Sequence, residues 1–225
     1  MSYSGGTLTP HCGASSNLLI GLPEGTPQIK YTNMKKLRRA VEECCKDDHE
    51  SRFLIVVDVP STILQEFDAE YLDKGPRISA NIQERILILR TMTKKAHEMV
   101  ARDLEFYIRV QILDMCLREK IRDTGNARVT NQAGTFVKEP DTSFTPDGHE
   151  WPTLTIETGL SEKKGKLTID ARGWLESDGS ETQVVITANI DRTIPRVTFD
   201  KWERKSEPQR VTRSSRLPGY IAEEV

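Results

Sequence analysis

The chain has 225 residues, of which 36% are hydrophobic and 29% are charged, and its formal net charge is −2. This length is sufficient for a real hydrophobic core, and the composition is typical of a soluble globular protein. The near-neutral charge gives no overall signal for nucleic-acid binding, and no stretch approaches the ~20 apolar residues of a membrane helix.

The N-terminus and the cysteines indicate an intracellular protein. The first residues, MSYSGGTLTPHCGASS, lack the basic and compact apolar regions of a signal peptide. Cys12, Cys44, Cys45 and Cys116 do not have the spacing of a disulfide framework, so reduced thiols are the simpler interpretation. We therefore expect a protein of the cytoplasm or nucleus that does not enter a membrane.

The first third of the chain is predicted to be a flexible segment followed by helix, strand and helix. Residues 1–31 are rich in Gly, Ser, Thr and Pro and show little periodicity, which is typical of a flexible segment. Apolar residues at helical spacing and a short β-branched run define the next three elements. These are a helix over about 33–47 capped by Thr32 or Asn33, a strand over 53–57, and a helix from Ile63 to Tyr71.

The remaining pattern predicts an α/β domain. A strand at 85–90 comes first, followed by a long helix at about 94–122 whose apolar stripe includes Met115 and Ile121. Three strands follow at 128–131, 135–137 and 153–157, and then a helix at about 165–177. The last two strands lie at 182–189 and 195–199, around a turn at 191–193. A mixed sheet with a helix on each face fits this order. We expect one domain over residues 32–205 and a loose basic tail over 206–225.

The C-terminal part carries a local excess of positive charge. Between Arg192 and Arg216 there are eight Lys and Arg against three Asp and Glu, a local net charge of +5. Such a run forms either a solvated surface or a contact with phosphate groups, and the sequence leaves both possibilities open.

Two carboxylates form the main candidate site. Asp141 follows Pro140, and sixteen residues later Glu157 ends the predicted strand 153–157. A carboxylate on a buried strand is costly unless it is paired or ligates a cation. The intervening loop is long enough to set both carboxylates on adjacent strands, where they could hold Mg²⁺ or Mn²⁺ for attack by a metal-bound water on a phosphate.

The segments EPDTSFTPDG, WPTLTIETGLSE and KLTIDARGWL resemble the PD-(D/E)XK phosphodiesterase superfamily. The match covers about residues 82–190, is similar to a group of uncharacterised fungal proteins, and is more distantly similar to the bacterial Uma2-like family. It implies a restriction-endonuclease-like mixed central sheet flanked by helices, with an N-terminal helix–strand–helix extension. It further implies a Mg²⁺-dependent nuclease acting on nucleic acid, with Asp141 and Glu157 as metal ligands and Glu98 assisting from the first core helix.

The chain departs from this family at the third motif position. A lysine is expected two residues after the glutamate, where this sequence has Gly159. Lys166 or Arg172 from the following helix could substitute, although an arginine stays protonated and could only stabilise charge. Two hypotheses therefore stay open: a nuclease in which Asp141→Ala or Glu157→Ala abolishes cleavage and leaves the fold intact, and a catalytically inactive binding or scaffold module of the same fold.

Each candidate residue also has a purely structural explanation. Asp141 could begin a turn, and Glu157 could form a salt bridge with a buried Arg or Lys. The other structural alternatives are a packed His97 beside a solvated Glu98, a solvated turn at Lys163, Lys164 and Lys166, a local ion pair for Asp170, and core packing for Trp151 and Trp174.

Overall fold

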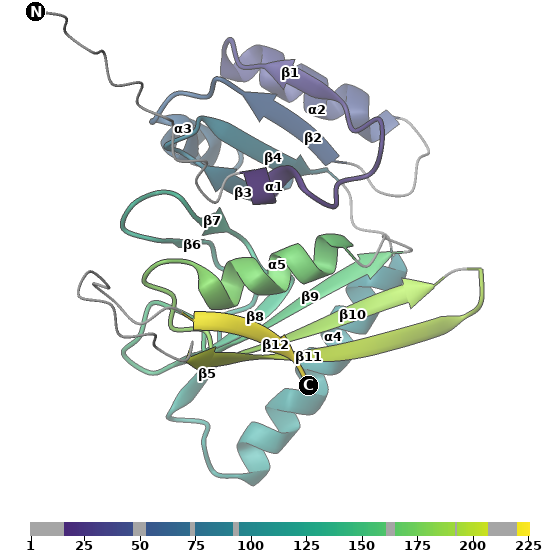
Figure 1. Cartoon of the computed structure of the whole chain (residues 1–225), viewed down its shortest axis with the longest axis vertical. Coiled ribbons are helices and arrows are strands. Elements are labelled where there is room, and N and C mark those ends of the chain that lie inside the picture. The colour runs from purple at the N-terminus through teal and green to yellow at the C-terminus, as the bar shows by residue number, and fades with distance from the viewer. Residues whose placement is uncertain are drawn as a thin grey trace, which may run out of the picture.

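The computed structural model describes residues 16–46, 53–72, 75–91, 95–160, 165–191, 193–206 and 220–225 (Figure 1). The described residues form two six-stranded mixed sheets, one built mainly from the N-terminal part and one from the C-terminal part. The predicted α/β class is confirmed, but two sheets take the place of the single sheet that the order of elements suggested.

The helices are α1 (Ser16–Leu19), α2 (Met34–Lys46), α3 (Ile63–Glu70), α4 (Lys95–Asp114) and α5 (Gly165–Glu176). The first sheet has the spatial order β1 (Gln28–Lys30), β2 (Phe53–Val57), β4 (Ile86–Arg90), β3 (Arg77–Asn81), β7 (Val137–Lys138) and β6 (Val129–Thr130). The second has the order β12 (Tyr220–Glu224), β11 (Arg196–Ser206), β10 (Val184–Asp191), β9 (Leu154–Leu160), β8 (Thr142–Pro146) and β5 (Ile121–Asp123).

The first sheet packs against α2 and α3. The side-chain oxygen of Asn33 accepts a hydrogen bond from the Lys36 N–H at 2.9 Å, which confirms the predicted cap of α2. The apolar runs of β2 and β4 are buried because helices cover them, and α2, α3, β2 and β4 lie within a residue or two of their predicted bounds. This core is formed by residues that include Leu37, Val56, Ile63, Phe67, Leu87 and Leu89.

The second sheet contains a compact α–β–β–β–α–β order made of α4, β5, β8, β9, α5 and β10. Strands β5, β8 and β9 pair antiparallel in turn, and α5 crosses over so that β10 runs parallel to β9. Helices α4 and α5 cover opposite faces of this sheet, and α5 lies between the two sheets (Figure 1). Trp174 of α5 is fully buried against Phe136 and Trp151, which confirms its predicted core role.

Helix α4 ends earlier than the sequence suggested. It stops at Asp114, Cys116 adopts a left-handed conformation with φ of +57°, and Ile121 belongs to strand β5. Met115 is exposed rather than part of a core-facing stripe. The predicted extension of the helix to residue 122 is wrong because apolar residues continue at helical spacing beyond the point where the backbone reverses.

Strand β9 is longer than predicted. Its parallel pairing with β10 continues through Thr158, Gly159 and Leu160, so Glu157 lies in the middle of the strand rather than at its end. Helices α4 and α5 both pack on β9, and the Glu157 side chain is only 1% exposed.

The two ends of the chain contain more structure than predicted. Residues 28–30 form β1, which pairs parallel with β2, and residues 220–224 form β12, which pairs with β11. Residues 16–31 of the segment expected to be flexible thus contain α1 and β1, whereas residues 1–15 and 207–219 lie outside the described parts of the chain.

Gly21 is expected to tolerate no side chain. It has a φ of +80°, and a Cβ atom there would lie 2.6 Å from the backbone nitrogen of Lys166 and 2.7 Å from its Cα. We expect Gly21→Ala to lower the free energy of unfolding by about 2–5 kcal/mol, because left-handed strain and a backbone clash add together. Urea denaturation would measure the loss.

Gly25 provides the matched control, since it has nearly the same φ, +79°, with nothing within 4 Å of the added Cβ. Gly25→Ala should lower the free energy of unfolding by about 1–2 kcal/mol, because it introduces only the strain of a left-handed backbone and no clash. Equal losses in the two variants would contradict a close approach of Gly21 to the start of α5.

Candidate functional site

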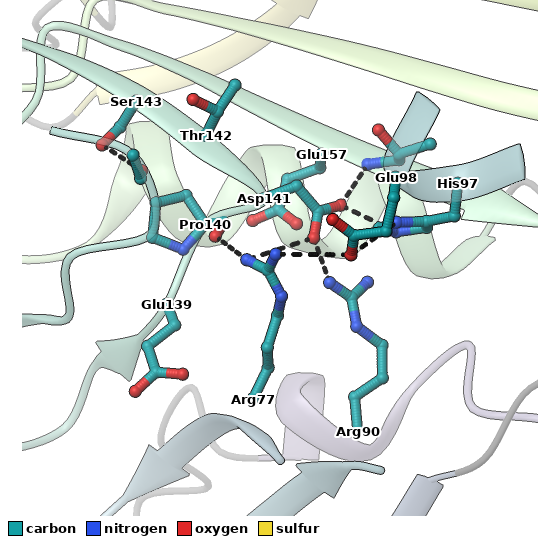
Figure 2. Close-up of polar contacts among 12 residues, drawn as sticks. Arg77, Arg90, His97, Glu98, Glu139, Pro140, Asp141, Thr142, Ser143 and Glu157 are labelled. Carbon is teal, nitrogen blue, oxygen red and sulfur yellow. Dashed lines mark hydrogen bonds and ion pairs between the residues drawn. The ribbon is translucent and has the colours of Figure 1, made fainter. Parts of the chain in front are cut away.

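Strands β8 and β9 bring the two predicted carboxylates together. The antiparallel register pairs Thr142 with Ile156, and its continuation places Asp141 opposite Glu157. The Asp141 N–H donates to the Ile156 carbonyl at 3.2 Å, and the Thr158 N–H donates to Asp141 Oδ2 at 2.7 Å. Side chains that lie opposite each other on antiparallel strands share one face, so the two carboxylates are neighbours (Figure 2).

Asp141 is surrounded by positive charge. An Arg90 guanidinium nitrogen contacts Oδ1, Arg77 Nη1 lies 3.5 Å from the same oxygen, and His97 Nε2 lies 3.0 Å from Oδ2. Figure 2 shows both arginines reaching from the first sheet toward the carboxylate. Burial alone would raise the pKa of Asp141, but the charges of Arg90, His97 and Arg77 hold that pKa well below its usual range. Asp141 is thus a buried, ionised carboxylate.

Glu157 occupies a different environment although it lies next to Asp141. Its Oε1 accepts a hydrogen bond from the indole N–H of Trp174 at 2.6 Å, and Lys138 Nζ lies 3.3 Å away. Burial raises the pKa of Glu157, the charge of Lys138 opposes that shift, and the nearby Asp170 and Asp141 carboxylates raise it further. The two neighbouring acids therefore differ in their readiness to take up a proton.

Asp170 and two buried lysines, Lys138 and Lys166, adjoin the two carboxylates, and these five residues are called the cluster below. Lys138 Nζ lies 2.8 Å from Asp170 Oδ1, and the Lys166 ammonium contacts the same oxygen. Burial would lower the pKa of Lys138, but the charges of Asp170 and Glu157 raise it above its ordinary value. Burial would likewise raise the pKa of Asp170, and Lys138 and Lys166 lower it. Lys138 and Asp170 are therefore charged, and Lys166 is connected to Glu157 only through Asp170 and Lys138.

The other sequence-predicted residues lie at different distances from this cluster. Glu98 is half-buried, with Oε1 lying 3.8 Å from Arg77 Nη2 and 3.9 Å from His97 Nδ1, so it borders the surroundings of Asp141. Arg172 is exposed on α5, with Nε lying 4.0 Å from Glu176, and is not brought to the carboxylates. Lys163 and Lys164 lie outside the described residues.

Sequence reasoning missed the cations that hold the carboxylates. Lys138 lies three residues before Asp141 and directly follows the predicted strand 135–137, and Arg90 ends the apolar run of β4. A single charged residue closing an apolar strand was the available signal in both cases. Arg77 begins β3, a strand that the sequence did not predict, so nothing suggested its approach to Asp141.

The donor set does not fit a divalent cation in this arrangement. Oδ1 of Asp141 faces two guanidinium groups, and Oδ2 accepts a backbone N–H and faces His97. A divalent cation at Asp141 would have to displace these partners and stand beside their positive charge. Within the described ranges, no group of three or more His, Cys, Asp or Glu side chains is arranged to hold a metal ion.

Two cavities that are lined by described residues adjoin the cluster. A small one of about 20 Å³, large enough for one water, is lined by residues that include Arg77, Arg90, Lys138, Lys166 and Asp170. A larger pocket of about 490 Å³ shares Arg77 and Arg90 with it and also has Arg102, Arg128, Tyr71 and Glu98 in its wall. The arginines on Asp141 therefore also face a space that can admit a ligand.

The basic residues near the C-terminus are used partly for local structure. The Arg204 guanidinium lies 3.6 Å from the centre of the Tyr220 ring, and Lys201 pairs with Glu203 at 2.5 Å. These contacts fit the solvated-surface interpretation for β11, and Arg192, Arg210, Arg213 and Arg216 lie outside the described residues.

None of the helices in the described parts of the chain has the length and apolar character needed to cross a membrane. Comparisons with protein-family models, with curated proteins and with solved structures gave no match. Function is therefore inferred from the site itself.

Proposed function

We propose that the chain is a nucleic-acid-binding module built on a nuclease-like core, in which internal cations hold the carboxylates that a metal would hold in an active nuclease. The observation that carries this proposal is the engagement of buried Asp141 by Arg90, Arg77 and His97. The α–β–β–β–α–β order, with Asp141 before β8 and Glu157 in β9, supports a PD-(D/E)XK-like core.

The arginines support a phosphate-bearing partner. A guanidinium group forms planar, charge-assisted hydrogen bonds to phosphate oxygens and carries its positive charge at every physiological pH. Four arginines line the larger pocket, and two of them are fixed in place by Asp141. A phosphate group could therefore contact the cluster without a metal between them.

A metal-dependent nuclease is the second candidate, and Lys138 favours it. Its Nζ lies 3.3 Å from Glu157, so a lysine stands beside the carboxylate pair although the motif position holds Gly159. In this alternative, Mg²⁺ or Mn²⁺ would bind after Arg90 and Arg77 release Asp141, and the lysine would come from β7 rather than from α5.

One experiment separates the two candidates. For the binding module, isothermal titration of the wild-type protein with Mn²⁺ should give no saturable heat, and a labelled oligonucleotide should bind with EDTA present and remain uncut when Mn²⁺ is added. The physical reason is that the oxygens of Asp141 are already occupied by cationic groups and by the Thr158 N–H.

Glu157→Gln is the control variant because it removes one proposed metal ligand and nearly preserves the volume of the side chain. Saturable Mn²⁺ binding and strand cleavage by the wild type, both lost in Glu157→Gln, would establish the nuclease and refute the binding module. Absence of oligonucleotide binding under all conditions would refute both candidates.

A further inference from the structure

The larger pocket lies where the two halves of the molecule meet. Tyr71 follows α3, Arg77 and Arg90 belong to β3 and β4 of the first sheet, Arg102 belongs to α4, and Arg128 precedes β6. Its volume of about 490 Å³ is within the range of about 300–1,000 Å³ that is usual for small-ligand sites. A nucleic-acid duplex is instead recognised over an extended surface of roughly 1,000–2,500 Å². The volume of the pocket therefore suits a small ligand group rather than a duplex.

The arginines of the pocket differ in how fully they are engaged. Arg128 pairs with Glu139 and Asp68, and Arg90 with Asp141. Arg102 forms no hydrogen bond or ion pair with any residue that the structure describes. Arg77 Nη2 lies 3.8 Å from Glu98, which is longer than a hydrogen bond. Donor groups of Arg102 and Arg77 are therefore left for an anion.

Tyr71 provides a second, independent indication of a ligand. Tyr71 lines the pocket, and its ring lies 4.6 Å from the ring of Phe67. Its hydroxyl is buried and has no hydrogen-bond partner within the described parts of the chain. Burial, the largest cause, raises the pKa of Tyr71, so the hydroxyl keeps its proton and can donate. A buried donor without a partner is unfavourable, and a ligand oxygen would satisfy it.

We propose that this pocket binds the terminal phosphate monoester of a nucleic-acid strand, with Arg102, Arg77 and Tyr71 as the donors to the phosphate oxygens. A monoester carries about −1.5 to −2 charges at pH 7, compared with one charge on an internal diester, so a pair of guanidinium groups favours a strand end. The carboxylate of Asp68 and the amide of Asn126, in the same wall, can bond to sugar or base groups.

Glu98 acts as a competing anion in this arrangement. It lines the pocket beside Arg77, and its side chain is partly exposed. A bound phosphate would take over the guanidinium group that Glu98 now faces. Removing the carboxylate should therefore strengthen phosphate binding, which is the opposite of its effect if Glu98 assisted a catalytic metal.

The proposal rests on the proposed nucleic-acid binding and is tested with two strands of one sequence. A single-stranded oligonucleotide with a 5′-phosphate and its 5′-hydroxyl twin, both labelled at the 3′ end, are titrated by fluorescence anisotropy in EDTA. We expect the phosphorylated strand to bind about tenfold more tightly, to lose this preference in Arg102→Met, and to retain only part of it in Tyr71→Phe. Glu98→Gln should strengthen binding of the phosphorylated strand about threefold.

Arg109→Met is the matched control, because Arg109 is an exposed arginine on the same helix that lies outside this pocket. It should lower the affinity for both strands slightly and keep their ratio. Equal affinities of the two strands for the wild type, or an unchanged ratio in Arg102→Met, would overturn the pocket assignment and leave the proposed nucleic-acid binding in place.

Titration of free adenosine monophosphate by calorimetry separates a failure of the phosphate site from a failure of the proposed nucleic-acid binding. Binding of the nucleotide that is lost in Arg102→Met, together with no binding of either strand, would refute the proposed function and keep the phosphate site. If the nucleotide does not bind and the phosphorylated strand shows no preference over its hydroxyl twin, the proposed phosphate site is refuted.

Discussion

Asp141→Asn is expected to lower the free energy of unfolding by about 3–5 kcal/mol at pH 7, because the substitution leaves Arg90 and Arg77 without their buried counter-charge. The amide can still accept the Thr158 N–H, so the loss reports the charge rather than the shape. The sequence had suggested that substitution of Asp141 leaves the fold intact. Urea denaturation of both proteins measures the difference.

The pH dependence of this difference has a defined sign. The folded-state pKa of Asp141 lies below its unfolded value of about 3.9, so its charged form stabilises the fold above that pH. This contribution is lost as the pH falls below about 4 toward the folded-state pKa. The difference in free energy of unfolding between wild type and Asp141→Asn should therefore have its full size at pH 7 and should shrink progressively below pH 4.

Asp147→Asn is the matched control for Asp141, since Asp147 directly follows β8 and its ion pair with Arg122 is exposed. An exposed pair contributes about 0–1 kcal/mol, so this variant should stay close to the wild type. A loss in Asp141→Asn no larger than that in Asp147→Asn would mean that the buried ion pairs do not stabilise the fold.

Lys138→Met is expected to cost about 3–5 kcal/mol at pH 7, because it leaves the buried Glu157 and Asp170 carboxylates without a shared cation. The pKa of Glu157 is already raised, chiefly by burial, and loss of Lys138 should raise it further. An acid with a raised folded-state pKa gains stability as the pH falls, because the folded protein takes up the proton first. The variant should thus recover part of its loss between pH 7 and pH 5.

Urea denaturation at the two pH values tests this expectation, with Lys201→Met as the control. Lys201 is half-exposed and pairs with Glu203 at the surface, so its loss should cost less than about 1 kcal/mol at both pH values. A loss in Lys138→Met that is the same at pH 7 and pH 5 would show that Glu157 does not take up a proton there.

The sequence predicted the elements that have strong periodicity. Strand β2 and helices α2, α3 and α5 lie close to their predicted bounds, because apolar spacing and a cap such as Asn33 are local signals. Strands β3 and β8 were missed because RISAN and TSFTP are short and contain few apolar residues, and because each also pairs with a strand that is not its neighbour in the sequence, β7 and β5 respectively. The end of α4 was missed because the turn at Cys116 interrupts no apolar pattern.

The candidate site was predictable only in part. Asp141, Glu157 and Glu98 were predicted as site residues from the family resemblance, and the structure places Asp141 beside Glu157 with Glu98 at the margin. Their partners were not recognisable because the ion pairs connect residues far apart in the chain, as in Arg77 and Arg90 with Asp141. Which cation reaches a buried carboxylate depends on how the two sheets pack.

The segment that joins the two sheets has a consequence for where the domain boundary can be drawn. Lys138 ends β7 in the first sheet, and β8 in the second sheet begins at Thr142, so Asp141 stands at the crossing. A fragment limited to residues 82–190, the range of the family resemblance, would keep Asp141 and Glu157 but would lose Arg77 and the whole of β3. The segment before residue 82 therefore supplies one of the cations that contact the buried Asp141 carboxylate.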